Sequence, residues 1–207
     1  MKKEIRTFKG EIRKAADGRK LTGTAVVFNQ LSQNLGGYRE QIDPGAFDGC
    51  EMDDVRCLIN HDESLLLGRT SSKTLSLSRD IDGLKFECET PDTSYARDLA
   101  ACMDRGDIDG CSFSFSVAPG GSDWSEDPAS GAVIRTVKKI ARLYDVGPVT
   151  FPAYTQTSSE IRSSADILAE RPGGLPTAGQ TAPPAISAAE TLKHLRRKLE
   201  LAYYQHV

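Results

Sequence analysis

The sequence has no long hydrophobic run and no apolar segment near its first residue. None of its apolar stretches approaches the roughly 18 residues that a membrane-spanning helix requires, and the opening MKKEIRTFKG has no apolar signal core. We therefore expect a soluble, intracellular protein that has no membrane partner.

Excess positive charge and paired cysteines are missing as well. The formal net charge is −3, whereas nucleic-acid binding depends on clustered lysine and arginine, so nucleic acid is not expected as a partner. The five cysteines are odd in number and form no C-x-x-C pair, which indicates neither a disulfide framework nor a zinc site. We expect reduced, mostly buried thiols, and no metal or other cofactor.

Histidine is scarce, because His61 is the only one in the first 193 residues. It follows the apolar run Val55–Ile59, which reads as a short strand, so its side chain would stand at a strand end. A single histidine next to two acidic residues is more often a surface or packing residue. The alternative is a general base that serves a nucleophile on a neighbouring strand.

A candidate nucleophile lies about fifty residues further on, in the stretch Gly110–Val117. Ser112, Ser114 and Ser116 alternate there with apolar residues, so along a strand the serines share one face. This pattern also fits a half-buried antiparallel strand with a hydrated outer face. Both interpretations remain open on the pattern alone.

Asp145 is the candidate for a third polar residue of the same site. If the strand through 141–145 is regular, Asp145 shares a face with Ala141 and Leu143. An unpaired buried carboxylate is costly, and His61 would supply a partner. Alternatively the strand end is exposed and the carboxylate is solvated.

The remaining pattern predicts a β-rich α+β domain of about seven short strands with one clear helix. We expect hairpins from 3–13 with 20–28 and from 74–78 with 84–89, a helix over 93–105, a loop over 119–131, and a strand or strand pair over 132–146. Asp80 and Asp82 lie in the second hairpin and are assigned to its turn rather than to a metal loop.

The composition divides the chain into three parts. Residues 1–157 form the domain, residues 158–186 are rich in proline, glycine, alanine and threonine and are expected to be a disordered linker, and residues 187–207 form a basic amphipathic helix. A short tethered amphipathic helix commonly docks on a partner or self-associates.

Three motifs, in this order, resemble the prohead maturation protease family of tailed bacteriophages, which are serine peptidases distantly similar to the herpesvirus assemblins. The resemblance covers about the first 155 residues. It rests on Asn60-His61-Asp62 with Leu66–Arg69, on Gly110–Phe113, and on Leu143–Val146 running into Val149–Ala153.

The resemblance implies a role for each candidate residue. His61 matches the catalytic histidine and Ser112 the nucleophile, while Asp145 occupies the place of the third member, where the family often has glutamate. Ser114 stands where the family usually has glycine, which makes it the alternative nucleophile. The implied fold is a small β-barrel like that of the herpesvirus protease, with packed helices.

The implied function is that of a prohead maturation serine endopeptidase. Such an enzyme cleaves the N-terminal or scaffolding segment of the major capsid protein, and itself, inside a prohead that assembles in the host cytoplasm. One alternative is a catalytically inert capsid scaffold or assembly protein with the same fold. Another is a metal-dependent hydrolase that uses His61 with Asp62, Glu63 and Cys57, although this spacing suits a metal poorly.

Overall fold

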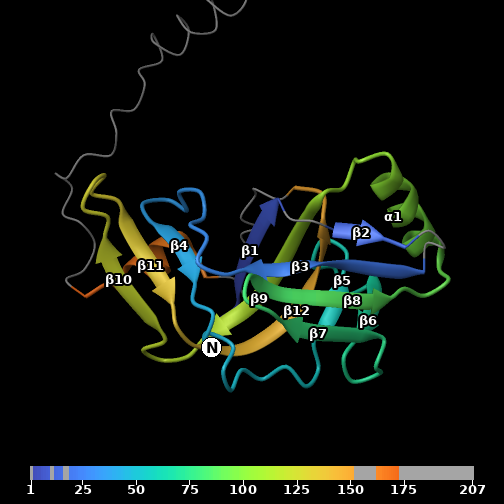
Figure 1. Cartoon of the computed structure of the whole chain (residues 1–207), viewed down its shortest axis with the longest axis horizontal. Helices are drawn as coiled ribbons and strands as arrows, with labels where there is room; N and C mark the ends of the chain where they lie inside the picture. Colours follow the sequence, from blue (N-terminus) through green and yellow to red (C-terminus); the bar gives the residue numbers. More distant parts are fainter. Residues whose placement is uncertain (1, 10–11, 16–18, 152–161, 173–207) are drawn as a thin grey trace, which may run out of the picture. The chain divides into compact units, whose positions relative to one another are not determined.

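The computed structural model describes residues 2–9, 12–15, 19–151 and 162–172 and is mostly β-structure (Figure 1). This part of the chain holds twelve strands in three sheets and two helices. It falls in the compact unit Met1–Pro172, and the second unit, Gly173–Val207, lies outside the described residues. Among the described residues, no helix is both long and apolar enough to span a bilayer.

A five-stranded sheet carries Ser112 and Asp145, and His61 follows one of its strands. Its strands, in spatial order, are β1 (Glu4–Lys9), β9 (Gly110–Val117), β12 (Ile140–Val149), β5 (Arg56–Leu58) and β6 (Leu66–Arg69). β9 runs antiparallel to both of its neighbours, whereas β12 and β5 are parallel. The segments around His61, Ser112 and Asp145 are therefore adjacent through direct strand pairing.

A four-stranded sheet contains both predicted hairpins. Its order is β2 (Ile12–Lys14), β3 (Lys20–Val27), β8 (Gly83–Glu89) and β7 (Leu75–Arg79). The turn assigned to Asp80 is confirmed, because its carboxylate accepts hydrogen bonds from the amides of Asp82 and Gly83, each at 2.9 Å. The expected single strand over 3–13 is wrong, because β1 leaves this segment for the five-stranded sheet and only β2 joins the hairpin.

The third sheet differs from the expectation of a loop over 119–131. Its order is β10 (Ser122–Glu126), β11 (Val133–Val137) and β4 (Arg39–Ile42), which lie side by side in Figure 1. Trp124 of β10 packs edge-on against Tyr38, with ring centroids 5.6 Å apart. Glycine and aspartate in this segment favour a loop, so the local sequence does not predict the strand. The strand is stabilised by tertiary packing of that tryptophan rather than by β-propensity.

The five-stranded and four-stranded sheets share one hydrophobic core. The apolar members of the alternating β9 pattern, Phe113 and Phe115, are 2% and 0% exposed and face Leu21, Val26 and other buried residues of the second sheet. Helix α1 (Ser94–Asp104), predicted over 93–105, buries Leu99 in the same core. Gly106 follows the C-terminal end of the helix, and its φ of 77° lies in the left-handed region that terminates helices.

Residues 162–172, assigned to the linker from composition, are part of the compact unit. They form helix α2 (Ser164–Leu168), which begins at a capping box between Ser163 and Asp166. Ile167 and Leu168 are buried against Tyr38. The rest of the predicted linker and the terminal helix over 187–207 lie outside the described residues.

A buried ion network joins β1 to the three-stranded sheet and to the segment before α2. Arg135 donates to Glu4 at 2.5 Å and to Glu40 at 2.7 Å, and all three side chains are at most 2% exposed. Arg6 bonds both carboxylates, and Arg162 bonds Glu4. Burial alone would raise the pKa of Glu4, but the hydrogen bond and charge of Arg135 outweigh it, so this pKa lies below its ordinary value. The network therefore favours the ionised form of Glu4.

Replacing Arg135 with methionine is expected to lower the free energy of unfolding by about 3 kcal/mol or more, because it leaves buried carboxylates without their central partner. The matched control is Arg97→Met, which removes an exposed arginine paired with Asp92 and is expected to cost about 1 kcal/mol or less. Urea unfolding measures both values. Equal losses in the two variants would contradict a structural role for the network.

Candidate functional site

His61 lies on a tight turn directly after β5. The amide of Asp62 donates to the carbonyl oxygen of Ile59 at 3.0 Å, and both central residues of the turn, Asn60 and His61, have positive φ, 54° and 59°. This pair of left-handed residues is the requirement of a type I′ turn, in which asparagine is favoured at the first central position. The conformation is unfavourable for histidine, so surrounding contacts must hold it.

Asn60 and Gly147 supply those contacts. The Asn60 side chain donates to Thr150 Oγ1 at 3.0 Å and accepts from the Thr150 amide at 2.8 Å, which fastens the turn to the end of β12. At Gly147, a Cβ atom would lie 2.1 Å from the carbonyl oxygen of Leu58. Only glycine therefore lets the chain before His61 approach β12 this closely.

The serine face of β9 is buried, not hydrated. Ser112, Ser114 and Ser116 are 0%, 1% and 1% exposed. Buried hydroxyls require partners, and those of Ser112 and Ser114 bond to His61 and Asp145. The half-buried interpretation of the alternating pattern is wrong for this strand.

Asp145 reaches the serine face through an irregularity in β12. Leu143 pairs with Phe115 and Asp145 with Ser114, so two residues advance on β12 while one advances on β9. This bulge turns Asp145 toward the serines and leaves Leu143 on the apolar face. The expectation that Asp145 and Leu143 share a face is therefore wrong. Asp145 is 5% exposed and paired, not solvated at an open strand end.

The three candidate side chains form one hydrogen-bonded cluster, the His61–Ser112–Asp145 cluster. His61 Nδ1 lies 2.5 Å from Asp145 Oδ1, and His61 Nε2 lies 2.5 Å from Ser112 Oγ. A carboxylate can only accept, so the neutral imidazole carries its proton on Nδ1 and leaves Nε2 as an acceptor. Nε2 is then placed to receive the hydroxyl proton of Ser112.

Ser114 is in the same cluster but in a different position. Its hydroxyl donates to Asp145 Oδ2, so it bonds the carboxylate and not the acceptor nitrogen of His61. This second hydrogen bond fixes the Asp145 carboxylate while His61 occupies the other oxygen. The geometry favours Ser112 over Ser114 as the group that His61 can deprotonate.

Strand β1 covers Ser112. The Ser112 hydroxyl also lies 3.0 Å from the carbonyl oxygen of Arg6, and a hydroxyl has one proton to donate. Arg6 is held by its side chain, which donates to Glu40 at 2.6 Å and 3.0 Å. Because Ser112 has no exposed surface, a bound molecule reaches its Oγ only after a local displacement. β1 is an edge strand of its sheet and is paired with β9 alone.

The residues of the metal-hydrolase interpretation do not come together around His61. The Asp62 carboxylate accepts from the amide and hydroxyl of Ser64 within its own turn. A hydrogen bond with Cys88 and burial hold the pKa of the Cys57 thiol well above its ordinary value, which disfavours a thiolate ligand. Within the described residues, no three histidine, cysteine or acidic side chains are arranged to hold a metal ion.

Asn60→Ala is expected to lower the turnover of any reaction at this cluster by about 100-fold, because a displacement of about 1 Å of a reacting group has an effect of this size. The substitution removes both bonds to Thr150 and the tolerance of positive φ. Asn34→Ala is the matched control, since Asn34 accepts from the amides of Gly36 and Gly37 in an exposed turn. Turnover unchanged in Asn60→Ala would contradict this positioning role.

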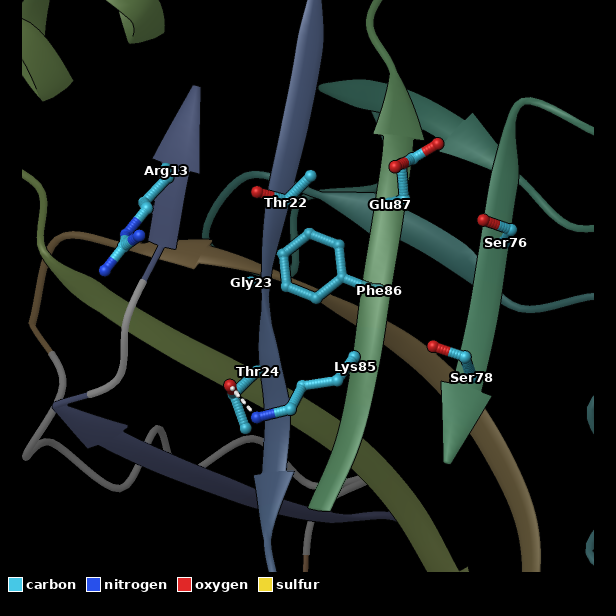
Figure 2. A pocket seen from close by; sticks show the side chains of 9 residues that line it. All are labelled: Arg13, Thr22, Gly23, Thr24, Ser76, Ser78, Lys85, Phe86 and Glu87. Carbon is cyan, nitrogen blue, oxygen red and sulfur yellow. Dashed lines mark hydrogen bonds between the residues drawn. The ribbon is translucent and has the colours of Figure 1, made fainter. Parts of the chain in front are cut away.

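Apart from a cavity of about 660 Å³ whose lining includes Trp124 and Arg162 and no member of the cluster, two smaller cavities lie on different sheets. The larger of these two, of about 430 Å³, lies on the four-stranded sheet (Figure 2), where Lys85 donates to Thr24 Oγ1 at 3.0 Å. None of its nine lining residues is a histidine. The smaller, of about 250 Å³, is lined by His61 itself. The cavity relevant to the cluster is therefore the smaller one.

Sequence reasoning missed three residues that build the cluster. The motif around the histidine contains Asn60 without assigning it a role, and no motif points to Gly147 or Arg6. Asparagine before the histidine is a usable signal, because it is the residue other than glycine that tolerates positive φ best. Nothing local marks Arg6, because its carbonyl oxygen meets Ser112 through pairing of strands that are distant in the sequence.

Comparison with known proteins shows the family to which the chain belongs. The prohead protease of Enterobacteria phage HK97 is 32% identical over 163 residues, covering 75% of this chain and 66% of that protein, so the chain spans about two thirds of that relative's length. The structure of the bacteriophage T4 capsid assembly protease aligns with a TM-score of 0.42 and 11% identity, over 72% of this chain and 97% of the other. The family described as caudovirus prohead serine protease matches residues 6–170. This chain therefore belongs to the caudovirus prohead serine protease family.

Proposed function

We propose that the chain is a serine endopeptidase in which Ser112 is the nucleophile. The proposal rests on the position of His61, whose Nε2 lies 2.5 Å from Ser112 Oγ and whose Nδ1 lies 2.5 Å from Asp145 Oδ1. Nε2 removes the hydroxyl proton as Oγ attacks the scissile carbonyl carbon, and then returns the proton to the leaving amine. Asp145 holds the productive tautomer and stabilises the imidazolium that forms. Water then hydrolyses the acyl-enzyme: Nε2 accepts a proton from the attacking water and returns it to Ser112 Oγ as the acyl group leaves.

The proposed substrates are the N-terminal or scaffolding segment of the major capsid protein, and the chain itself. Membership of a family described as prohead proteases supports this class of partner. Cleavage would take place inside the assembling prohead in the host cytoplasm, and the basic helix predicted over 187–207 would direct the chain to the shell. Confinement in a shell raises local concentration, so weak binding suffices.

We also propose that the domain is a small β-barrel like that of the herpesvirus protease. The support is the packing of the five-stranded and four-stranded sheets on one shared core.

Coexpression with the capsid protein of the same phage tests the function. Intact mass spectrometry should show truncated capsid protein with the wild-type chain and full-length protein with His61→Ala. Asn34→Ala, in an exposed turn, serves as the folded control and should cleave as the wild type does. Equal processing with wild type and His61→Ala would reject the peptidase and favour an inert capsid scaffold with the same fold.

A further inference from the structure

A small cavity opens directly beside His61. Its volume of about 250 Å³ is below the roughly 300–1,000 Å³ of pockets that enclose whole small-molecule ligands. A cavity of this size suits one amino-acid side chain. It is lined by Ile5, Thr7, Asn60, His61, Val149, Thr150 and Phe151.

Strand register places this cavity on the same face of the sheet as Ser112. Thr7 pairs directly with Ser112, and Ile5 with Ser114, across the β1–β9 ladder. On the other side of β9, Val149 pairs with Gly110. Directly opposed residues point to the same face, so the cavity walls stand on either side of the serine row.

Apolar atoms make up most of the exposed lining of the cavity. Ile5 and Val149 are 8% and 4% exposed, whereas Phe151 is 66% exposed and leaves a large apolar surface at the rim. The polar groups of Asn60 and Thr150 bond to each other, and both ring nitrogens of His61 have partners in the cluster. Among the described residues, no lysine, arginine, aspartate or glutamate lines the cavity, so a charged side chain would meet no counter-charge from them.

We propose that this cavity is the specificity pocket of the enzyme and binds one uncharged, apolar side chain of the substrate. The proposal rests on the peptidase function above. The side chain belongs to a residue within about four positions of the scissile bond, because an extended peptide advances about 3.3 Å per residue and the cavity borders His61. Phe151 is the specificity-determining residue that covers this side chain.

The test uses a library of peptides made by digesting a bacterial lysate, with cleavage sites read by mass spectrometry. The wild-type chain should cut sites with an aliphatic or aromatic side chain at one fixed position, at least about 10-fold more often than sites with a charged one. Phe151→Ala should reduce this preference. Phe151→Asp should shift it toward lysine and arginine, since it places a carboxylate at the rim.

The matched control is Ile81→Ala, which removes the other exposed large apolar side chain of the described residues, 89% exposed in the turn between β7 and β8. It should leave the site preference unchanged. In parallel, a fluorophosphonate probe reports the reactivity of Ser112 without using the cavity.

Two outcomes separate the pocket from the peptidase function. Labelled Ser112 and efficient cleavage without a positional apolar preference, or an identical preference in Phe151→Asp, would overturn the pocket alone. Absence of both labelling and cleavage would overturn the peptidase function, and the pocket with it.

Discussion

Ser112→Ala is expected to lower kcat for peptide-bond hydrolysis by about 10⁶-fold, the loss typical when the nucleophile of such a cluster is removed. The hydroxyl of Ser112 is the one within 2.5 Å of His61 Nε2. Ser114→Ala removes only a hydrogen bond to Asp145. Because a hydrogen bond to a charged group contributes about 1.5–3 kcal/mol, its effect should stay near or below about 100-fold.

Purified variants assayed on the cognate capsid protein measure this difference. Labelling with a fluorophosphonate, followed by mapping of the modified peptide, identifies the nucleophile directly. Thermal unfolding of both variants shows whether each remains folded. A label on Ser114, or full cleavage by Ser112→Ala, would show that the assignment of the nucleophile is wrong.

Asp145→Asn is expected to lower kcat by about 10⁴-fold, with the fold retained. The asparagine amide can donate to Nδ1, which stabilises the tautomer with the proton on Nε2. His61 then faces Ser112 with a donor and cannot accept its proton. Nitrogen NMR of the His61 ring reports the tautomer, and single-turnover assays report the rate.

Asp145→Glu is the matched control for this prediction. It keeps the carboxylate and adds one methylene. We expect a smaller loss than in Asp145→Asn, because the acceptor for Nδ1 is retained. An equal loss in the two variants would indicate that the geometry of the buried site, rather than the tautomer, determines the rate.

Burial of the cluster connects the fold to the chemistry. The apolar face of β9 packs in the shared core and fixes the strand. On its serine face, the Ser112 hydroxyl bonds to the carbonyl oxygen of Arg6 in β1, and the Arg6 side chain is anchored by Glu40 in the ion network. Low exposure strengthens each hydrogen bond of the cluster, but it also requires β1 or its surroundings to move before a peptide can bind.

The structure confirms several sequence-based predictions that rest on local residue patterns. Alternation identified β9, the glycine at 106 identified the end of α1, and the aspartates at 80 and 82 identified a turn. Tertiary pairing overrode local pattern elsewhere. Local pattern predicts a loop where β10 forms, and it predicts one strand over 3–13 although this segment contributes strands to two sheets.

The sequence by itself determined which residue types were available to the site. One histidine in the first 193 residues, a row of serines at period 2 and an acid ending an apolar strand restricted the chemistry. Only the tertiary structure decided that these groups meet. A one-residue bulge turns Asp145 onto the serine face, and Gly147 admits the chain that carries His61. Both depend on pairings between residues far apart in the chain, and the local sequence does not predict such pairings.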